Sequence, residues 1–190
     1  MDLLLPPGLT FARDVISPQQ EATLLAACAE CQLSYYSQDP NNPRSSASFG
    51  WKYDFANDSF LPCAPIPDAF QDACAIAARF GNTTPEAIVE CLLNRYEPGA
   101  IIQPHCDKPV FDKIIGLSLG SAADMVFSKP AELGGDAVTL TLPPRSIYMM
   151  QGEARDIWRH ALPHIPVTRW SLTFRTLSPA GEALRAALGS

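Results

Sequence analysis

Three histidines occur in the whole chain, and one of them stands two positions from a carboxylate, in the segment His105-Cys106-Asp107. Residues i and i+2 of a β-strand point to the same side, so these two side chains can bind one ligand together. His160 lies in another predicted strand and can complete the set. Two histidines and one carboxylate on one face of an ion are typical of non-haem Fe(II) sites, which keep positions open for a cosubstrate and dioxygen.

The identity of the third ligand rests on local pattern. His160 alternates with apolar residues on one predicted strand face, whereas His164 is flanked by Pro163 and Pro166. We therefore prefer His160 to His164. A His-x-Asp pair also occurs by chance in surface turns, so the spacing alone leaves a plain turn open as the alternative.

Two arginines, Arg169 and Arg175, lie six positions apart in one predicted strand and therefore on one face of it. At about 3.3 Å per residue they are roughly 20 Å apart along the backbone, so two long side chains leaning inward can grip a short dicarboxylate. The planar fork of arginine suits a carboxylate better than the lysine ammonium does. A pair of solvated arginines at a sheet edge is the other interpretation.

The elements that must position these residues follow two patterns. Ser17-Pro18-Gln19-Gln20 supplies an N-cap, a first-turn proline and an N3 glutamine, which predict a helix to about residue 32. Apolar residues at helical spacing, with Gly81 as the stop, predict a second helix over 67–80. Short strands bounded by Gly, Pro or Asp are then predicted over residues 88–96, 101–106, 113–119, 124–127, 137–142, 146–150, 157–162 and 169–177. The expected fold is mainly β with flanking α, a double-stranded β-helix (jelly roll) with the N-terminal helices on one outer face.

Between the helices, residues 34–63 are rich in Ser, Asn, Pro and aromatic residues, which predicts a long surface loop with a short hairpin near 49–55.

Composition limits the class of protein. With 190 residues, 47% of them hydrophobic and 18% charged, the chain can bury a real core, and we expect a single domain over 1–190. No apolar run approaches the roughly 18 residues of a membrane span, and the acidic N-terminus is unlike a signal peptide. We therefore expect a cytoplasmic protein without membrane contact, and the six cysteines agree with a reducing compartment. The net charge of −6 excludes a cationic coat for nucleic acid, so any such contact must use a local patch.

Several segments, taken in order, resemble those of the AlkB-like Fe(II)/2-oxoglutarate-dependent dioxygenases. They are Asn94-Arg95-Tyr96 with Pro98-Gly99, His105-x-Asp107, Leu117-Ser118-Leu119-Gly120, Trp158-x-His160 and Arg169-x5-Arg175. Weaker likeness reaches back to Phe49, so the resemblance covers most of the chain. It implies that His105, Asp107 and His160 ligate Fe(II).

The resemblance also implies a cosubstrate site and a substrate lid. Arg169 and Tyr96 would hold the remote carboxylate of 2-oxoglutarate, while Arg175 and Asn94 would reach the keto-acid end beside the iron. The catalytic jelly-roll core would span 88–177 and the lid 34–63.

Aromatic residues of this lid would cover the target. Trp51 and Tyr53 would stack on a nucleobase, with Arg44 and Lys52 meeting phosphates. Ordinary hairpin packing is the alternative for both rings.

The implied activity is oxidative demethylation of N-alkylated bases in DNA or RNA, as in DNA repair. O2 would be the oxidant, the products would include formaldehyde, succinate and CO2, and a monomer would take the base from a single strand or flipped out of a duplex. One departure leaves the base preference open: the best-studied members carry an acidic residue just after the metal motif, whereas this chain has Lys108-Pro109-Val110, with Asp112 as the nearest acid. The same iron chemistry on a modified tRNA base, a protein side chain or a small metabolite stays open, as does a non-catalytic metal-binding jelly-roll module.

Overall fold

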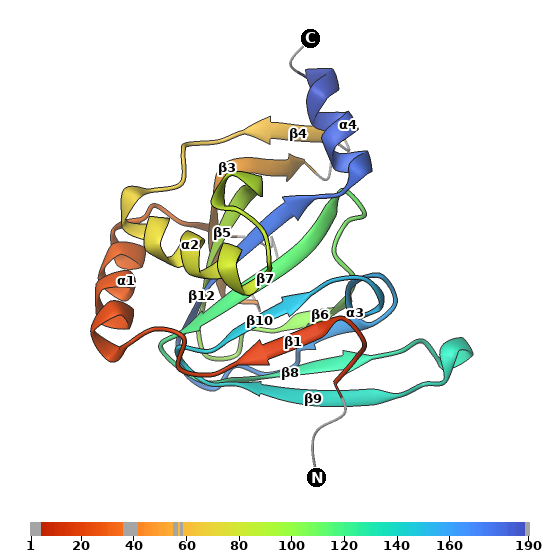
Figure 1. Cartoon of the computed structure of the whole chain (residues 1–190). Coiled ribbons are helices and arrows are strands. Elements are labelled where there is room, and N and C mark those ends of the chain that lie inside the picture. Colours follow the sequence, from red (N-terminus) through yellow and green to blue (C-terminus); the bar gives the residue numbers. More distant parts are fainter. Residues whose placement is uncertain (1–4, 36–41, 55–56, 58, 189–190) are drawn as a thin grey trace.

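The computed structural model describes residues 5–35, 42–54, 57 and 59–188. Over these residues the chain forms two antiparallel sheets, as the predicted jelly roll requires (Figure 1). The larger sheet contains, in spatial order, β1 (Leu9–Ala12), β10 (Ile147–Met150), β7 (Phe111–Leu119), β12 (Arg169–Leu177), β5 (Ile88–Tyr96), β3 (Arg44–Asp54) and β2 (Ser34–Tyr35), with β4 (Ser59–Pro62) paired to β3. The smaller sheet contains β6 (Ile102–His105), β11 (Arg159–Leu162), β8 (Ala123–Ser128) and β9 (Ala137–Leu142). Each strand predicted from residue 88 onward is present, with small shifts at the ends.

Two helices pack on the outer face of the larger sheet, which confirms their predicted place. α1 (Pro18–Glu30) begins with the expected capping box, since the Gln20 amide donates to Ser17 Oγ at 3.2 Å and the Ser17 amide donates to Gln20 Oε1 at 2.8 Å. α2 (Gln71–Phe80) follows a 3-10 turn over Asp68–Phe70 and ends at Gly81. None of the described helices is long and apolar enough to cross a membrane.

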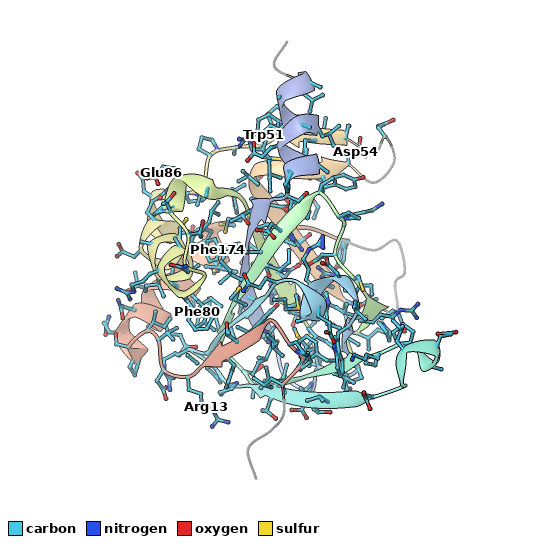
Figure 2. The ribbon with its side chains drawn as sticks, turned by 45° about the vertical axis from the view of Figure 1, so that its right-hand side comes forward. Arg13, Trp51, Asp54, Phe80, Glu86 and Phe174 are labelled. Carbon is cyan, nitrogen blue, oxygen red and sulfur yellow. The ribbon has the colours of Figure 1, made fainter. Side chains whose placement is uncertain are left out.

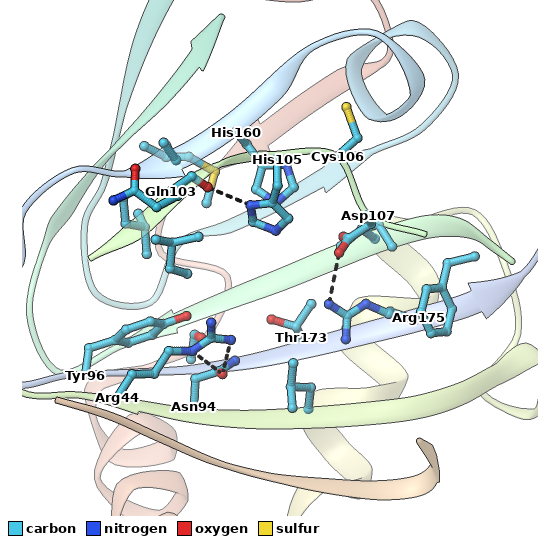
Figure 3. A pocket seen from close by; sticks show the side chains of 18 of the residues that line it. Arg44, Asn94, Tyr96, Gln103, His105, Cys106, Asp107, His160, Thr173 and Arg175 are labelled. Carbon is cyan, nitrogen blue, oxygen red and sulfur yellow. Dashed lines mark hydrogen bonds and ion pairs between the residues drawn. The ribbon is translucent and has the colours of Figure 1, made fainter. Parts of the chain in front are cut away.

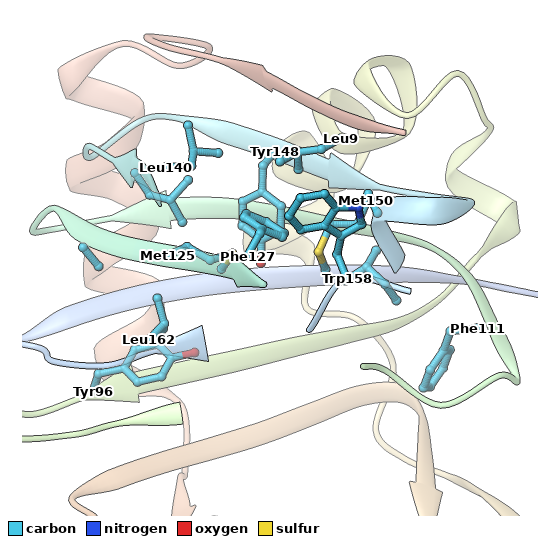
Figure 4. Packing of buried hydrophobic residues seen from close by; sticks show 14 of the residues in the cluster. Leu9, Tyr96, Phe111, Met125, Phe127, Leu140, Tyr148, Met150, Trp158 and Leu162 are labelled. Atoms are coloured by element: carbon cyan, nitrogen blue, oxygen red, sulfur yellow. The ribbon is translucent and has the colours of Figure 1, made fainter. Parts of the chain in front are cut away.

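The larger sheet separates two hydrophobic clusters by strand alternation. On β12, Leu172 and Phe174 belong to the cluster beneath α1 and α2 (Figure 2). Each such side chain, fully buried, contributes about 1.5–3 kcal/mol to folding. The other cluster lies between the sheets, where Phe127, Tyr148 and Trp158 pack together (Figure 4). The face of β12 that turns toward this second cluster is the one that carries Arg169 and Arg175.

The prediction of a long loop over 34–63 was wrong for most of its length. Residues 44–54 form β3, which pairs with β5 as far as Gly50 and then with β4. Gly50, at φ 81°, redirects the strand, and its amide donates to the Ala64 carbonyl at 2.7 Å. The predicted hairpin is therefore real but longer than 49–55. The remainder of the loop, residues 36–41, 55–56 and 58, lies outside the described residues.

Three further elements had no counterpart in the prediction. β1 pairs with β10 at the edge of the larger sheet, and the short helix α3 (Glu153–Asp156) precedes β11. α4 (Pro179–Leu188) follows β12 and lies against β4 (Figure 1). Ser178 begins α4, because its hydroxyl accepts from the Gly181 amide at 3.2 Å, and this Ser-Pro start was a signal present in the sequence.

Candidate functional site

A cavity of about 550 Å³ lies between the two sheets, lined by their inward-facing side chains (Figure 3). Strand alternation decides which residues reach it. β5 contributes Glu90, Leu92, Asn94 and Tyr96, and β12 contributes Arg169, Ser171, Thr173 and Arg175. The two arginines predicted to share a strand face therefore line one cavity, together with the predicted Asn94 and Tyr96.

His105, Asp107 and His160 come together at one end of this cavity. β6 and β11 pair antiparallel with His105 opposite His160, so the two ring centroids are 4.3 Å apart. Asp107 follows β6 closely, and one donor atom from each of the three residues lies within 4.8 Å of the others (Figure 3). Among the described residues, this is the only group of His, Cys, Asp and Glu side chains with the spacing of metal ligands. His164, the alternative, is exposed beyond the end of β11 and outside the group.

Hydrogen bonding and burial prepare the two rings to bind a cation. Nδ1 of His105 lies 2.9 Å from the carbonyl oxygen of Gln103, which can only accept, so Nδ1 carries the proton and Nε2 keeps its lone pair. Burial lowers the pKa of His160 to about 4, so this ring is neutral near pH 7. A neutral imidazole is the form that ligates a metal ion.

Arg175 connects Asp107 to a second buried carboxylate, Glu90. The Arg175 guanidinium donates to Asp107 Oδ1 at 3.3 Å through Nη2 and to Glu90 Oε2 at 3.1 Å through Nη1. Burial acts to raise the pKa of Asp107, but Arg175 and the two histidine rings outweigh it, so the pKa is lowered and the carboxylate stays ionised. Glu90 was missed by the sequence analysis. An acid within the apolar run of residues 88–93 was the only available signal.

Arg169 is a deeply buried cation at the other end of the cavity. It is 1% exposed, its Nη2 donates to Ser118 Oγ at 2.9 Å, and its guanidinium lies 5.3 Å from the centre of the Tyr96 ring. None of the ion pairs formed by the described residues includes Arg169, and its Nε has no hydrogen-bond partner among them. A buried charge without a counter-ion is costly. An anionic ligand at this position would supply the missing partner.

Arg44, which was predicted to meet phosphates, lies beside Asn94 and Tyr96. Arg44 lines the cavity, where its Nε and Nη2 donate to Asn94 Oδ1 at 3.1 and 2.7 Å (Figure 3). Its guanidinium lies 5.5 Å from the centre of the Tyr96 ring. The cause is register, because Arg44 on β3 stands opposite Tyr96 on β5, and Tyr96 in turn stands opposite Arg169 on β12. Two guanidinium groups therefore flank Tyr96 from neighbouring strands.

The two lid aromatics occupy different environments. Tyr53 lines the cavity and is buried, with its ring edge-to-face against Phe60 and Phe111 at centroid distances of 5.7 and 6.5 Å. Trp51 is half-buried and packs on Phe60 at 6.4 Å, but it is not among the described residues that line the cavity. Tyr53 thus adjoins the space that a ligand would fill, while Trp51 supports the hairpin.

The donor set fits a divalent metal ion and a dicarboxylate. Oδ2 of Asp107 is buried, and none of the described residues gives it a hydrogen bond, so a metal ion beside the two imidazoles would complete its coordination. Arg175 neutralises charge at this end of the cavity, and at the other end Arg169 is a cation that forms no ion pair with the residues the structure describes. A short dicarboxylate that binds the metal through one end would meet a guanidinium at both.

Comparison with known proteins gives the family. The model of the 2OG-Fe(II) oxygenase superfamily matches residues 8–175. The tRNA (carboxymethyluridine(34)-5-O)-methyltransferase alkbh8 of Xenopus tropicalis is 32% identical over 165 residues, which cover 83% of this chain and 25% of that protein. RNA demethylase ALKBH9B of Arabidopsis thaliana is 25% identical over 151 residues, which cover 70% of this chain and 30% of that protein. The chain therefore spans a minor part of the length of these relatives.

Solved structures agree on the fold. The structure of OsALKBH1 superposes with a TM-score of 0.69 at 16% identity, covering 90% of this chain and 99% of that one. The matched residues 8–175 include both sheets and all the strands that line the cavity. Only the last two residues of β12 lie beyond the match. The chain therefore belongs to the 2OG-Fe(II) oxygenase superfamily as an AlkB-like member, and its cofactors are those of the family: Fe(II), 2-oxoglutarate and O2.

Proposed function

We propose that this protein oxidatively demethylates N-alkylated bases in DNA or RNA, with release of formaldehyde, succinate and CO2. The observation that carries the proposal is the cavity itself. A His-Asp-His group lies at one end, Arg169, which is buried and forms no ion pair with the described residues, lies at the other, and an aromatic ring adjoins the space between the sheets. This arrangement matches an enzyme that binds a metal, a keto acid and a flat ligand together.

In this proposal the chain's own residues hold and orient the reactants. His105, Asp107 and His160 would hold Fe(II), which with 2-oxoglutarate and O2 supplies the oxidation of a C–H bond when bound. Arg175 keeps Asp107 ionised and oriented through the hydrogen bond at 3.3 Å. The neutral state of His160 near pH 7 leaves a ligand nitrogen without a competing proton.

The dicarboxylate would be bound by charge pairing at both ends. Arg169, with Tyr96 beneath it, would take the remote carboxylate, because this cation has no counter-ion among the described residues. Arg175 and Asn94 would adjoin the keto-acid end. Asn94 is fixed by Arg44, whose two hydrogen bonds leave the amide nitrogen of Asn94 directed away from the guanidinium.

A nucleobase would bind beside Tyr53, on the side of the cavity formed by the β3–β4 hairpin. Aromatic rings stack on any base, and single-stranded or flipped bases are the ones that can enter a cavity. One relative is an RNA demethylase, which supports demethylation, and another is a tRNA methyltransferase, which supports a nucleic-acid substrate. We expect a monomer to suffice, since residues of a single chain line the cavity.

A second candidate is oxidation of a modified tRNA base, favoured by the 32% identity to the alkbh8 protein. Both candidates share the metal and cosubstrate residues and differ in the product. One assay distinguishes them: the purified protein with Fe(II), 2-oxoglutarate and either methylated oligonucleotides or bulk tRNA, read by mass spectrometry. Loss of a methyl group from the oligonucleotides supports demethylation. Addition of oxygen to a tRNA nucleoside, without methyl loss, supports the second candidate and contradicts the first.

A further inference from the structure

Glu90 is the second acidic side chain that lines the cavity, and strand register places it there. It stands directly opposite Arg175 where β5 pairs with β12, and both side chains face the cavity. Glu90 is 4% exposed. Because burying a carboxyl group costs free energy, this acid must be compensated by its partners, and those partners lead to the metal ligands.

Four side chains form one hydrogen-bonded series from β3 to the metal site. Ser48 Oγ donates to Glu90 Oε1 at 3.1 Å, and Arg175 Nη1 donates to Glu90 Oε2 at 3.1 Å. Arg175 Nη2 donates to Asp107 Oδ1 at 3.3 Å (Figure 3). Burial raises the pKa of Glu90, although Arg175 and Ser48 act in the opposite direction. Both oxygens of Glu90 accept, as they do in an ionised carboxylate, so two carboxylates share one guanidinium.

The charges of this series determine how strongly the metal end of the cavity attracts a cation. Imidazoles bind a metal in the neutral form, so Asp107 brings the negative charge of the three proposed ligands. The positive charge of Arg175, at 3.3 Å, offsets it. The Glu90 carboxylate on the other side of the same guanidinium leaves this group of three side chains with an excess of one negative charge. A negative group favours a divalent cation over a neutral one.

We propose that Glu90 is a positioning residue of the metal site, which balances the charge of Arg175 so that Asp107 keeps its attraction for the metal ion. The inference rests on the metal site of the proposed function and does not depend on which substrate is oxidised. With Glu90 in place, Arg175 can orient Asp107 through Oδ1 while Oδ2 stays directed at the metal. Without the charge of Glu90, Asp107 would be the carboxylate partner left to Arg175 among the described lining residues, and the pair would be neutral.

Metal binding in the absence of substrate tests this proposal. The probe is Mn(II), which has the charge of Fe(II) and is stable in air, and it is titrated by calorimetry without 2-oxoglutarate. Glu90→Gln keeps the shape and removes the charge, so we expect its Kd for Mn(II) to rise at least about tenfold, the equivalent of about 1.4 kcal/mol. Glu90→Asp keeps the charge and should bind Mn(II) within about threefold of the unaltered protein.

A double variant separates charge from structure. Glu90→Gln combined with Arg175→Gln removes one charge of each sign, so we expect it to recover most of the Mn(II) affinity that Glu90→Gln alone loses. A purely structural role of Glu90 predicts a double variant that binds no better than the single one. Glu21→Gln is the matched control, because Glu21 on α1 is also buried and also accepts from an arginine, Arg145, at 3.0 Å. Glu21 is not among the described residues that line the cavity, so its Kd for Mn(II) should not change.

The affinity for 2-oxoglutarate gives a second readout, measured at saturating Mn(II). Glu90→Gln should bind 2-oxoglutarate at least as tightly as the unaltered protein does, because Arg175 then has one carboxylate partner fewer. Opposite effects on the two ligands are specific to the balance of charge. Equal weakening of metal and 2-oxoglutarate binding would reflect a disordered cavity and would contradict the proposal.

An unchanged Kd for Mn(II) in Glu90→Gln overturns the role of Glu90, as does a double variant that recovers nothing. If circular dichroism shows Glu90→Gln unfolded, the same change is made in the Arg175→Gln background. The double variant must then bind Mn(II) about tenfold more weakly than Arg175→Gln does, and equal affinity contradicts the proposal. His105→Ala tests the ligand assignment separately. Undiminished Mn(II) binding in His105→Ala would show that the proposed ligands are wrong, whereas lost binding there with an unchanged Glu90→Gln overturns the role of Glu90 alone.

Discussion

At the scale of single residues, the cavity is distinguished by buried charged groups whose pairing the described residues leave incomplete. Asp107 keeps one oxygen without a hydrogen bond, and Arg169 has no counter-ion. Folding does not favour such groups, because each costs desolvation free energy that a hydrogen bond or ion pair would offset. Two such groups in one cavity are expected where bound ligands, here a metal ion and an anion, supply the missing partners.

The metal ligands give the first prediction. His105→Ala, Asp107→Ala and His160→Ala should each abolish turnover and weaken metal binding, because each removes one of three donors that lie within 4.8 Å. Anaerobic titration calorimetry with Fe(II) should give one site in the unaltered protein. His164→Ala is the control, since this exposed side chain lies outside the group. Loss of metal binding in the control, with His160→Ala retaining it, would show that the third ligand is misassigned.

Arg169 gives the second prediction. Arg169→Ala should raise the KM for 2-oxoglutarate by about thirtyfold or more, as truncating one partner of a buried charge pair costs about 2–5 kcal/mol. Arg95→Ala is the matched control. Arg95 precedes Tyr96 on β5, but its side chain points away from the cavity. On that other side Arg95 pairs with Glu97 at 2.6 Å and stacks on Trp170. Succinate formation is measured against 2-oxoglutarate concentration. If the two variants give the same KM, Arg169 does not bind 2-oxoglutarate.

At the scale of elements, the alternation of β5 and β12 explains why the central site could be predicted from the sequence. Asn94 and Tyr96, like Arg169 and Arg175, stand at even spacing on strands whose other face is apolar, so their common orientation follows from strand geometry alone. The helix α1 was predictable for a similar reason, because its capping box is a local signal.

The elements that the sequence did not predict depend on distant partners. β3 begins with small polar residues such as Ser45, Ser46 and Ser48, which have low strand propensity, and pairing with β5 makes them a strand. The place of Arg44 beside Tyr96 follows from that register and is therefore invisible in the local sequence. Glu90 was hidden for a different reason, because its partner Arg175 is 85 residues away.

The β3–β4 hairpin gives the third prediction. Tyr53→Leu should lose about 1–3 kcal/mol of oligonucleotide binding, the usual contribution of a base stacked on an aromatic ring, while its apolar volume keeps the core filled. Conversion of 2-oxoglutarate without substrate should persist, since the residues proposed to hold the metal and the two carboxylates are unchanged in this variant. Trp51→Leu should have a smaller effect, because Trp51 packs on Phe60 outside the cavity lining. A larger loss of binding in Trp51→Leu than in Tyr53→Leu would reverse the roles of the two rings.

At the scale of the whole molecule, the net charge of −6 predicts how nucleic-acid binding depends on salt concentration. Contacts limited to about two phosphates give a slope of roughly −1.4 in log K against log salt for a single strand. Lys52→Ala should make the slope shallower by about 0.7. Fluorescence anisotropy over a range of NaCl concentrations measures both values. A slope steeper than about −4 would require an extended cationic surface, which the composition argues against.

Oxidative demethylation is tested by the stoichiometry of the reaction on a methylated single strand. Formaldehyde and succinate are measured together, with the unmethylated strand of the same sequence as the control and His105→Ala as the inactive enzyme. Oxidative demethylation predicts one formaldehyde for each methyl group lost and for each succinate formed above the unmethylated control. Succinate production that the methylated strand does not stimulate, with no formaldehyde and no loss of methyl groups, would contradict the account.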